Sequence, residues 1–429
     1  MNPLIQLKET AAVQQFDLNK NMKKKIISFI VFPLFVCAAA HAQGITWTPA
    51  NPMNKARAFF VAVELLNGNV LVAGGFDGSL PFPPKPPPNA VFPDAEIYNW
   101  HTGEWTRITP MNTARTAAAA VRLEDGRVMV IGGADKNFNF LVSAEIYDPR
   151  TDTWSTKTAP MLNGPDFPGF GPRYEDFTAV LLPGRKVLVA GGFGGPDFAD
   201  LTVLNSAEIY DQKTNTWTPT GSMNVARGEF GTAVLNDGRV LAVGGVNFSG
   251  PLASAEIYDP RTGMWTLTKG SMGTGRNDLA LVVLRDGRVL AAGGEMDAQG
   301  DRSMSAEIFD PRTEKWTMTG PMTAPRSEVE YASVLLPDGR VLVPGGYTAN
   351  DPMLMHGIPV SSSDLYDPRT GTWTGSPLGS MSPPGSMSVV RAGHSSIVLR
   401  GNRGVLVMGG LGSDDNTATA SVDIAVPTR

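Results

Sequence analysis

The chain has 429 residues, of which 47 are glycine and 34 are proline, and charged residues make up only 18% of it. Its single cysteine excludes an intrachain disulfide and any zinc or iron–sulfur site built from cysteines. The formal net charge of −5 argues against nucleic-acid binding, for which a basic patch is typical.

The first element along the chain has the three-part layout of a secretory signal peptide. Three lysines at 23–25 precede an apolar run over 26–40, and an Ala-His-Ala cleavage pattern ends at Ala42, before Gln43. The run is short for a membrane span, so we expect no membrane span after cleavage. The pattern predicts a secreted or periplasmic protein.

The expected domain organisation follows from this segment. We expect residues 1–21 to be an upstream extension, 22–42 to be the signal peptide and 43–429 to be one domain. Cys37 lies within the signal, where the size of Val36 disfavours attachment of a lipid. After cleavage, 31 basic and 39 acidic residues remain, which gives a net charge of −8.

The remainder of the chain is one motif repeated seven times. Each copy contains a short apolar run that ends in a Gly-Gly pair, and most pairs are followed by a segment such as AEIYD and then a tryptophan. The Gly-Gly pairs lie at 74–75, 132–133, 191–192, 244–245, 293–294, 345–346 and 409–410. An Asp-Gly step splits the apolar stretch before several pairs, and it predicts a two-residue hairpin in which both residues have positive φ.

Each copy therefore predicts four short antiparallel strands, which we call a, b, c and d in chain order. Strand a precedes the Asp-Gly step, strand b runs into Gly-Gly, strand c is the AEIYD segment and strand d begins at the tryptophan. Four such strands in about 50 residues are typical of one blade of a β-propeller.

The Gly-Gly, Tyr and Trp residues, in this order and spacing, resemble the kelch repeat. The resemblance covers about residues 45–426 and implies an all-β, seven-bladed kelch-type propeller. The last copy lacks a tryptophan strand, whereas residues 45–48 (ITWT) precede the first copy. We therefore expect the N-terminal strand to complete the last blade, which removes exposed sheet edges. A six-bladed ring is the alternative.

Residues that recur in every copy are expected to maintain the fold. The tryptophans supply buried aromatic area and are predicted to be structural: Trp47, Trp105, Trp154, Trp217, Trp265, Trp316 and Trp373. An arginine is expected to open every strand a, at Arg57, Arg115, Arg173, Arg227, Arg276, Arg326 and Arg391. An acid recurs in each strand c, at Glu96, Glu145, Glu208, Glu256, Glu307, Asp364 and Asp423. A buried carboxylate needs a partner, so these residues predict repeated Arg–carboxylate pairs. The alternative is an arginine-lined anion site.

Variable loops on a rigid scaffold are where function is expected. The a–b and c–d loops are short and uniform, whereas the b–c loops 76–93, 193–205 and 347–362 and the d–a loops 159–172 and 377–390 vary. In a four-stranded blade, the b–c and d–a loops share one face. We call this the loop face and expect it to bind the ligand.

Four carboxylates lie two residues after the arginine in consecutive copies: Glu175, Glu229, Asp278 and Glu328. If this segment is a strand, residues i and i+2 share a side, and the carboxylates line one arc of the channel mouth. They are the candidate catalytic residues, because clustered carboxylates can have perturbed pKa values. Simple pairing with the arginines is the alternative. The candidate ligand-binding residues are Arg173, Arg227, Arg276, Arg326, His394 and Tyr174.

The sequence does not predict a metal or another cofactor, because its four histidines show no ligand spacing. We expect a monomeric scaffold that binds a glycan, peptide or protein on the loop face. The alternative is an enzyme acting on carbohydrate, since the resemblance includes a bacterial sialic acid epimerase. The resemblance also includes a galactose-type copper oxidase, whose cofactor needs a cysteine that the mature chain would lack.

Overall fold

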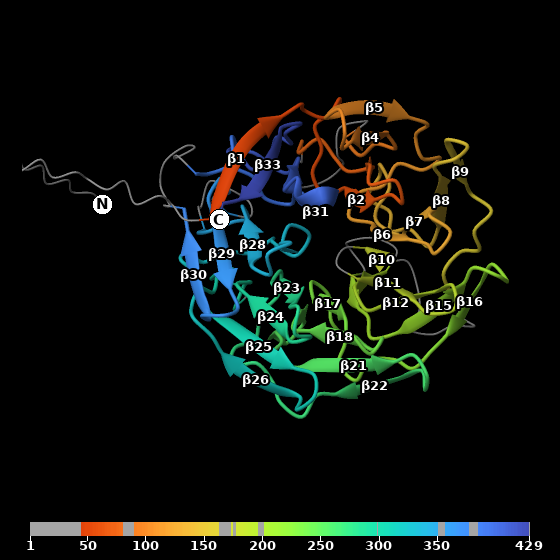
Figure 1. Cartoon of the computed structure of the whole chain (residues 1–429). Coiled ribbons are helices and arrows are strands. Elements are labelled where there is room, and N and C mark those ends of the chain that lie inside the picture. Colours follow the sequence, from red (N-terminus) through yellow and green to blue (C-terminus); the bar gives the residue numbers. More distant parts are fainter. Residues whose placement is uncertain are drawn as a thin grey trace, which may run out of the picture. The chain divides into compact units, whose positions relative to one another are not determined.

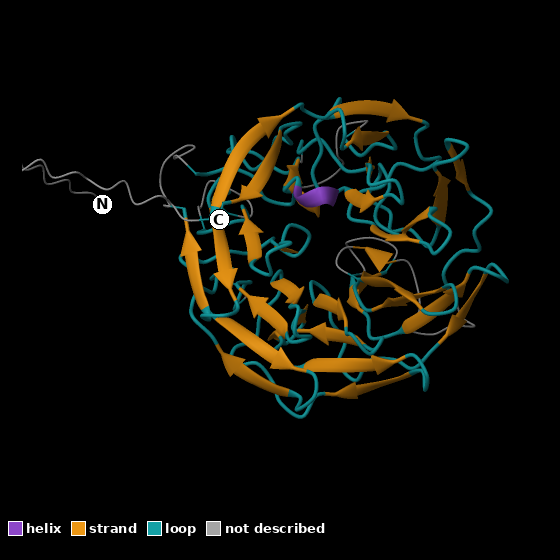
Figure 2. Cartoon of the chain, viewed as in Figure 1, coloured by secondary structure: helices purple, strands orange, loops and turns teal. Residues whose placement is uncertain are grey.

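The fold is seen in a computed structural model, which describes residues 44–79, 90–162, 173–174, 177–195, 201–297, 299–350, 357–376 and 385–428. Residues 42–429 form one compact unit. Its described part contains seven four-stranded antiparallel sheets, arranged as the blades of a propeller (Figures 1 and 2). The predicted all-β, seven-bladed fold is confirmed.

The blades follow the predicted a-b-c-d order. Blades 1 and 2 contain β2 (Val61–Glu64), β3 (Val70–Ala73), β4 (Ala95–Asn99) and β5 (Glu104–Ile108), then β6 (Ala119–Arg122), β7 (Val128–Ile131), β8 (Ala144–Asp148) and β9 (Thr153–Ser155). Blades 3 and 4 contain β11 (Thr178–Leu182), β12 (Lys186–Ala190), β15 (Ala207–Asp211) and β16 (Thr216–Pro219), then β17 (Gly231–Val234), β18 (Val240–Val243), β21 (Ala255–Asp259) and β22 (Met264–Leu267).

Blades 5 to 7 continue this order. Blades 5 and 6 contain β23 (Ala280–Val283), β24 (Val289–Ala292), β25 (Ala306–Asp310) and β26 (Lys315–Met318), then β27 (Val334–Leu335), β28 (Val341–Pro344), β29 (Ser363–Asp367) and β30 (Thr372–Gly375). Blade 7 contains β31 (Ser395–Val398), the 3₁₀ helix η2 (Arg400–Asn402), β32 (Val405–Met408), β33 (Val422–Pro427) and β1 (Ile45–Ala50).

The N-terminal strand closes the ring as predicted. β1 pairs antiparallel with β33 along its whole length, from Ile45 opposite Pro427 to Ala50 opposite Val422. In six blades the strand-d tryptophan lies opposite Tyr or Phe, with ring centroids 4.9–5.2 Å apart. In blade 7 Trp47 faces Ala425 instead, so the closing blade lacks this aromatic pair.

The hydrophobic core lies between neighbouring blades. Each strand b is buried on both sides, which is why it reads as a continuous apolar run. In β3, Leu71 packs toward blade 2, whereas its neighbour Val70 packs toward blade 7, beside Leu406. Strand residues alternate between the two sides, so one strand contributes to two cores.

A closed ring of backbone hydrogen bonds also joins the blades. The N–H of the second glycine in each Gly-Gly pair donates to the carbonyl of the arginine in the next blade, at 2.7–3.0 Å. The last bond runs from Gly410 to Arg57 and joins blade 7 to blade 1. Both glycines of every pair have positive φ, and a Cβ on Gly244 would collide with the carbonyl of Arg276. The repeated glycines therefore set the distance between blades.

The a–b hairpins differ from the prediction. Leu123 pairs with Arg127 across three residues, and the N–H of Gly126 donates to the carbonyl of Leu123. Gly126 has positive φ, at 87°, whereas Asp125 does not. The prediction that both residues need positive φ was wrong, because the loop is a three-residue turn in which only the glycine is left-handed.

The loop face carries a second small layer that the sequence did not predict. In blade 3 this layer is the sheet of β10 (Arg173–Tyr174), β13 (Phe193–Gly194) and β14 (Thr202–Val203), and in blade 4 it includes the hairpin of β19 (Val246–Asn247) and β20 (Gly250–Pro251). Elsewhere single bridges join the residue after the arginine to the residue after Gly-Gly. The prediction that the arginines open strand a was wrong, because they lie in this outer layer, several residues before strand a begins.

Candidate functional site

The seven repeated arginines form ion pairs with the strand-c acids of their own blades. The nitrogen–oxygen distances are 2.7–3.4 Å, and both side chains of each pair are 4% exposed or less. In addition, Nη1 of every arginine donates to the carbonyl of the first glycine of the Gly-Gly pair. One guanidinium thus connects the outer layer with the ends of strands b and c.

The acids in these pairs also hold the incoming d–a loop. Glu256 accepts hydrogen bonds from the backbone N–H groups of Asn224 at 2.7 Å and Val225 at 2.9 Å, besides that from Arg227. Equivalent bonds from the d–a loop reach the acid in every other blade. A buried carboxylate with several charge-assisted bonds is what a structural role requires.

Burial shifts the pKa values of these pairs. Burial lowers the pKa of Arg391 to about 10, although Asp423 opposes the change. Burial also raises the pKa of Glu208 more than Arg173 lowers it. At Glu145, burial raises the pKa, but bonds from Asn112 and Arg115 outweigh it and hold the pKa below its usual value.

These contacts determine what the candidate arginines can do. The predicted ligand-binding residues Arg173, Arg227, Arg276 and Arg326 are all 0% exposed. Their donors are directed to groups of their own blade, so the geometry favours the structural pairing over the anion site. Side-chain contacts of the sixth candidate, Tyr174, lie outside the described residues, although its backbone belongs to β10.

The candidate carboxylates do not lie on a strand. Glu229, Asp278 and Glu328 have left-handed backbones, with φ of 49–55°, and so do Phe59 and Ala117 at the same position of blades 1 and 2. The prediction that i and i+2 share a strand side was wrong, since the chain turns here before strand a begins. Glu175 lies outside the described residues.

The structure brings two of these carboxylates together. The side-chain amide of Asn277 donates to Glu229 Oε2 at 2.9 Å and to Asp278 Oδ2 at 2.8 Å. The N–H of Asp278 also donates to the carbonyl of Glu229 in the preceding blade. Asp278 is buried, and Glu229 and Glu328 are half-buried. The arrangement is an acidic arc on blades 4 to 6, fixed by the backbone.

His394 is part of the core. It is 1% exposed and packs against Gly345 of blade 6, as Phe60 packs against Gly409 at the equivalent blade junction. Burial, together with the charges of Arg391 and Arg326, holds the pKa of His394 well below its usual value. The histidine is therefore neutral and occupies the place of a core aromatic residue.

Sequence reasoning missed a set of exposed apolar residues on the b–c loops. Phe248 is 79% exposed, Met304 41%, Ile358 39% and Met296 36%. They belong to the b–c loops of blades 4, 5 and 6, which are consecutive. No periodic signal marks such residues, because they lie in loops.

A polar network holds these loops in place. Arg302 donates to Glu295 at 2.9 Å, to Ser327 at 2.7 Å and to Asn350 at 2.6 Å, which joins the outer layers of blades 5 and 6. In the same region the hydroxyl of the fully buried Tyr347 donates to Asp415 of blade 7. Burial raises the pKa of Tyr347 well above its usual value, and the charge of Asp415 adds to the effect. The exposed apolar residues of blades 5 and 6 therefore lie on loops that hydrogen bonds hold in place.

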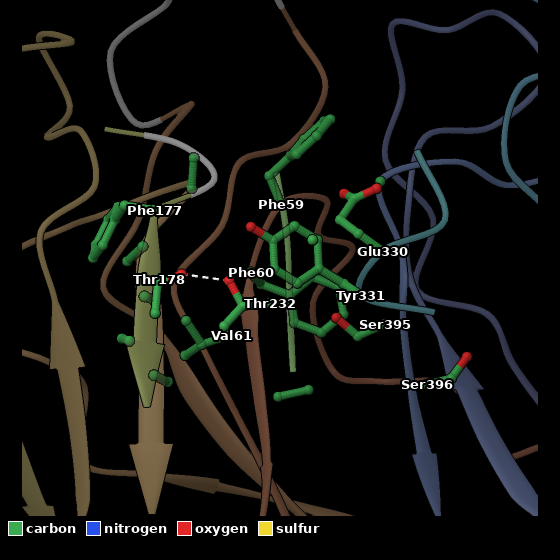
Figure 3. Close-up of a pocket in the computed structure, with 18 of the residues that line it drawn as sticks. Phe59, Phe60, Val61, Phe177, Thr178, Thr232, Glu330, Tyr331, Ser395 and Ser396 are labelled. Carbon is green, nitrogen blue, oxygen red and sulfur yellow. Dashed lines mark hydrogen bonds between the residues drawn. The ribbon is translucent and has the colours of Figure 1, made fainter. Parts of the chain in front are cut away.

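A cavity of about 310 Å³ lies on the axis of the ring and is lined by residues of all seven blades. Figure 3 shows Tyr331 projecting into it, with Phe59, Thr178, Thr232 and Ser395 around it. Thr178 and Thr232 hydrogen-bond to each other through their hydroxyl groups, which joins blades 3 and 4.

Within the described ranges, no three His, Cys, Asp or Glu side chains are grouped so that they could hold a metal ion. No helix in the same ranges has the length and apolar character needed to cross a membrane.

Comparison with family models finds the Kelch motif five times, at residues 57–112, 115–160, 177–224, 229–268 and 279–323. An F-box/kelch-repeat protein of Arabidopsis thaliana is 28% identical over 190 residues, which are 43% of this chain and 41% of that protein. Kelch-like protein 28 of Mus musculus is 38% identical over 118 residues, which are 27% of this chain and 19% of that protein. The chain thus matches less than half of either relative.

Among solved structures, a fungal alcohol oxidase of the AA5 family in complex with copper has a similar fold. The TM-score is 0.65 at 20% sequence identity, and the match covers 89% of this chain and 76% of that one. At this identity the likeness concerns the fold alone.

Proposed function

The chain belongs to the kelch-repeat family, and from this premise we propose that it is a protein-binding scaffold whose loop face recognises its partner. One observation carries the proposal: Phe248, Met296, Met304 and Ile358 are exposed on the loop face of three consecutive blades. Exposed apolar residues gathered on one face are typical of interaction sites. The loop face is also the face on which the loops vary.

Charge indicates the chemistry of the partner. The b–c loops contain the acidic residues Asp77, Asp135, Asp197, Asp200, Glu295, Asp297, Asp301, Asp351, Asp414 and Asp415, and the basic residues Lys85, Lys136 and Arg302. The acidic arc of Glu229, Asp278 and Glu328 adds to this excess. A segment with basic and apolar side chains complements such a surface. The partner is therefore a basic, apolar protein segment rather than an acidic one.

The second part of the proposal concerns location. The layout of residues 22–42 supports export, so the scaffold acts as a secreted or periplasmic monomer. Intact-mass measurement of the exported protein is expected to show a chain that starts at Gln43. A mass that retains residues 22–42 would refute cleavage at this site.

The carbohydrate-enzyme alternative gains no support from the site. An acidic sugar such as a sialic acid needs a cationic group for its carboxylate. The arginines that could supply one are 0% exposed and already bonded to acids. A glycan ligand on the loop face is an outcome that the binding experiment can reveal.

The experiment selects peptides from a random displayed library on the folded protein. We expect enriched sequences to combine Lys or Arg with apolar residues, and their binding to weaken as salt is raised. Changing Phe248, Met296 and Ile358 together to serine should weaken binding at least about tenfold. The matched control changes Met264 and Met318 to serine as well. These residues are 59% and 60% exposed on outer strands, so the control should leave peptide binding unchanged.

Three outcomes would overturn the proposal. One is enrichment of acidic peptides, and another is equal binding by the loop variant and the control. The third is concentration-dependent dimerisation in analytical ultracentrifugation that the loop variant abolishes, since the loop face would then bind a second copy of this chain.

A further inference from the structure

Blade 6 departs from the repeat at its inner strand. The arginine and the first glycine of the Gly-Gly pair are 17 residues apart in blades 1, 2, 4 and 5, but 19 apart in blade 6, from Arg326 to Gly345. The inner strand β27 has two residues, Val334–Leu335, whereas the inner strands of those four blades have four. Two additional residues are therefore placed before β27.

The additional residues form a turn that enters the ring. The N–H of Ser333 donates to the carbonyl of Val329 at 3.0 Å, and its hydroxyl donates to the same carbonyl at 2.7 Å. Glu330 and Tyr331 lie inside this turn and line the axial cavity (Figure 3). Tyr331 is 50% exposed, and its carbonyl accepts a hydrogen bond from the N–H of Ser396 in blade 7. The turn is thus attached to the ring while the phenol stays accessible.

The remaining wall of the cavity is uncharged and mostly apolar. Blade 2 contributes four consecutive alanines, 117–120, and blade 4 contributes Gly231. Phe59, Phe177 and Phe230 add aromatic surface, so the insertion supplies Tyr331 and the one carboxylate, Glu330, among the described residues that line the cavity. Among the described residues that line it, none is Lys or Arg. An anionic ligand would find no charge partner there.

The polar side-chain atoms of the cavity are hydroxyl oxygens, the carboxylate of Glu330 and the ring nitrogens of the buried His394. The hydroxyls belong to Thr178, Thr232, Ser395, Ser396 and Tyr331. Ser396 Oγ is buried and has no hydrogen-bond partner within the described part of the chain. Hydroxyls both donate and accept, and a carboxylate accepts from a ligand hydroxyl. Aromatic rings such as Tyr331 and Phe59 supply an apolar face next to these polar atoms.

We propose that the axial cavity is a binding site for a small neutral polyhydroxylated ligand, such as a hexose or a cyclitol. Tyr331 packs against the apolar face of the ligand, and Glu330 accepts a hydrogen bond from one of its hydroxyls. A cavity of about 310 Å³ lies at the small end of ligand pockets, which suits one sugar ring rather than a chain of them. This site is separate from the loop face and does not depend on the proposed scaffold function.

The test uses the folded protein with D-glucose, myo-inositol and D-glucuronate as probes in saturation-transfer NMR titrations. At least one neutral probe is expected to bind saturably, and D-glucuronate is expected to bind at least about tenfold more weakly, since burying its unpaired carboxylate is costly. Tyr331→Ala should weaken neutral binding about tenfold. Glu330→Gln should weaken it less, because the amide oxygen still accepts.

Two controls keep folding and location distinct from binding. Deletion of residues 330–331 restores the spacing of the regular blades, so this variant should fold and lose binding. Phe248→Ala, which changes the loop face, should leave binding of the neutral probe unchanged. The proposal is refuted if no neutral probe saturates, if D-glucuronate binds as well as D-glucose, or if Tyr331→Ala binds like the unchanged protein.

Discussion

Breaking one buried ion pair tests whether the repeated arginines maintain the fold. In blade 4, Glu256 is 0% exposed and accepts bonds from the side chain of Arg227 at 2.9 Å and from two backbone N–H groups. Glu256→Gln retains the size of the side chain but leaves the guanidinium charge buried without its counter-charge. Such a change costs about 3–5 kcal/mol of unfolding free energy.

Arg227→Met should cost a similar amount. It leaves the carboxylate without its cation and removes donors from the carbonyls of Gly244 and Ser254. The double variant should lose less unfolding free energy than the sum of the two single variants, by about 1–3 kcal/mol, because neither charge of the pair is then left buried without its partner. Urea unfolding followed by tryptophan fluorescence measures all three variants.

An exposed pair supplies the control for this cycle. Arg261 and Asp259 pair at 2.8 Å in a c–d turn, with 80% and 25% of their side chains exposed. Arg261→Ala should leave the urea midpoint unchanged, because water screens exposed charges. The structural role is refuted if Glu256→Gln costs less than about 1 kcal/mol, or if the effects of Arg227→Met and Glu256→Gln simply add.

Three further predictions follow from the fold. Gly244→Ala should lower the free energy of unfolding by more than about 3 kcal/mol, because the new Cβ collides with the carbonyl of Arg276. Gly238 has φ of +85° and open space around it, so Gly238→Ala should lower it by only about 1 kcal/mol, for the left-handed backbone alone. Urea midpoints compare the two variants. The pKa of His394 is lowered in the folded protein, so below pH 6.5 the unfolded chain binds a proton that the folded chain does not. The free energy of unfolding is therefore retained above pH 6.5 and decreases as the pH drops below this value, by up to about 1.4 kcal/mol per pH unit. His394→Phe should remove this loss in melts between pH 7 and 5, and an unchanged slope would contradict the assignment. Removing residues 44–50 exposes the edge of β33 and should produce aggregates in light scattering, whereas a monodisperse variant with an unchanged melting temperature would show that β1 does not close the ring.

The blade architecture could be predicted because it is written locally and repeated. Gly-Gly, the turn before it and the tryptophan each have a local meaning, and seven copies confirm one another. Ring closure was predictable by counting strands, since the last copy lacks a tryptophan strand and residues 45–48 supply one. The left-handed c–d turn residues were also predictable, as at Gly103, Asp152 and Asn215.

The errors lie where backbone geometry has no local sequence signal. Phe59, Ala117 and Glu229 adopt a left-handed backbone that favours glycine, and only Gly393 at the same position of blade 7 indicated it. The conformation is imposed by contacts between blades, such as the bond from the N–H of Ala117 to the carbonyl of Phe59. The two-residue strands of the outer layer are too short to show a period of two.

The candidate site could be located by face but not by residue. The loop face was predictable from variation among copies, whereas the exposure of Phe248 and Ile358 depends on how each loop packs. The burial of His394 depends on its contact with the neighbouring blade, and the sequence of a single repeat carries no information on that contact. By contrast, the insertion at Glu330 and Tyr331 was predictable from spacing, because blade 6 is two residues longer than the regular copies.

Hydrogen–deuterium exchange with a selected basic, apolar peptide tests the central claim most directly, because it maps the surface that recognises the partner. We predict that the peptide slows exchange in the b–c loops of blades 4 to 6, at 246–251, 299–305 and 357–360, and leaves the a–b turns unchanged. Protection confined to the a–b turns at 236–239 and 285–288, with unchanged exchange in the b–c loops, would contradict it.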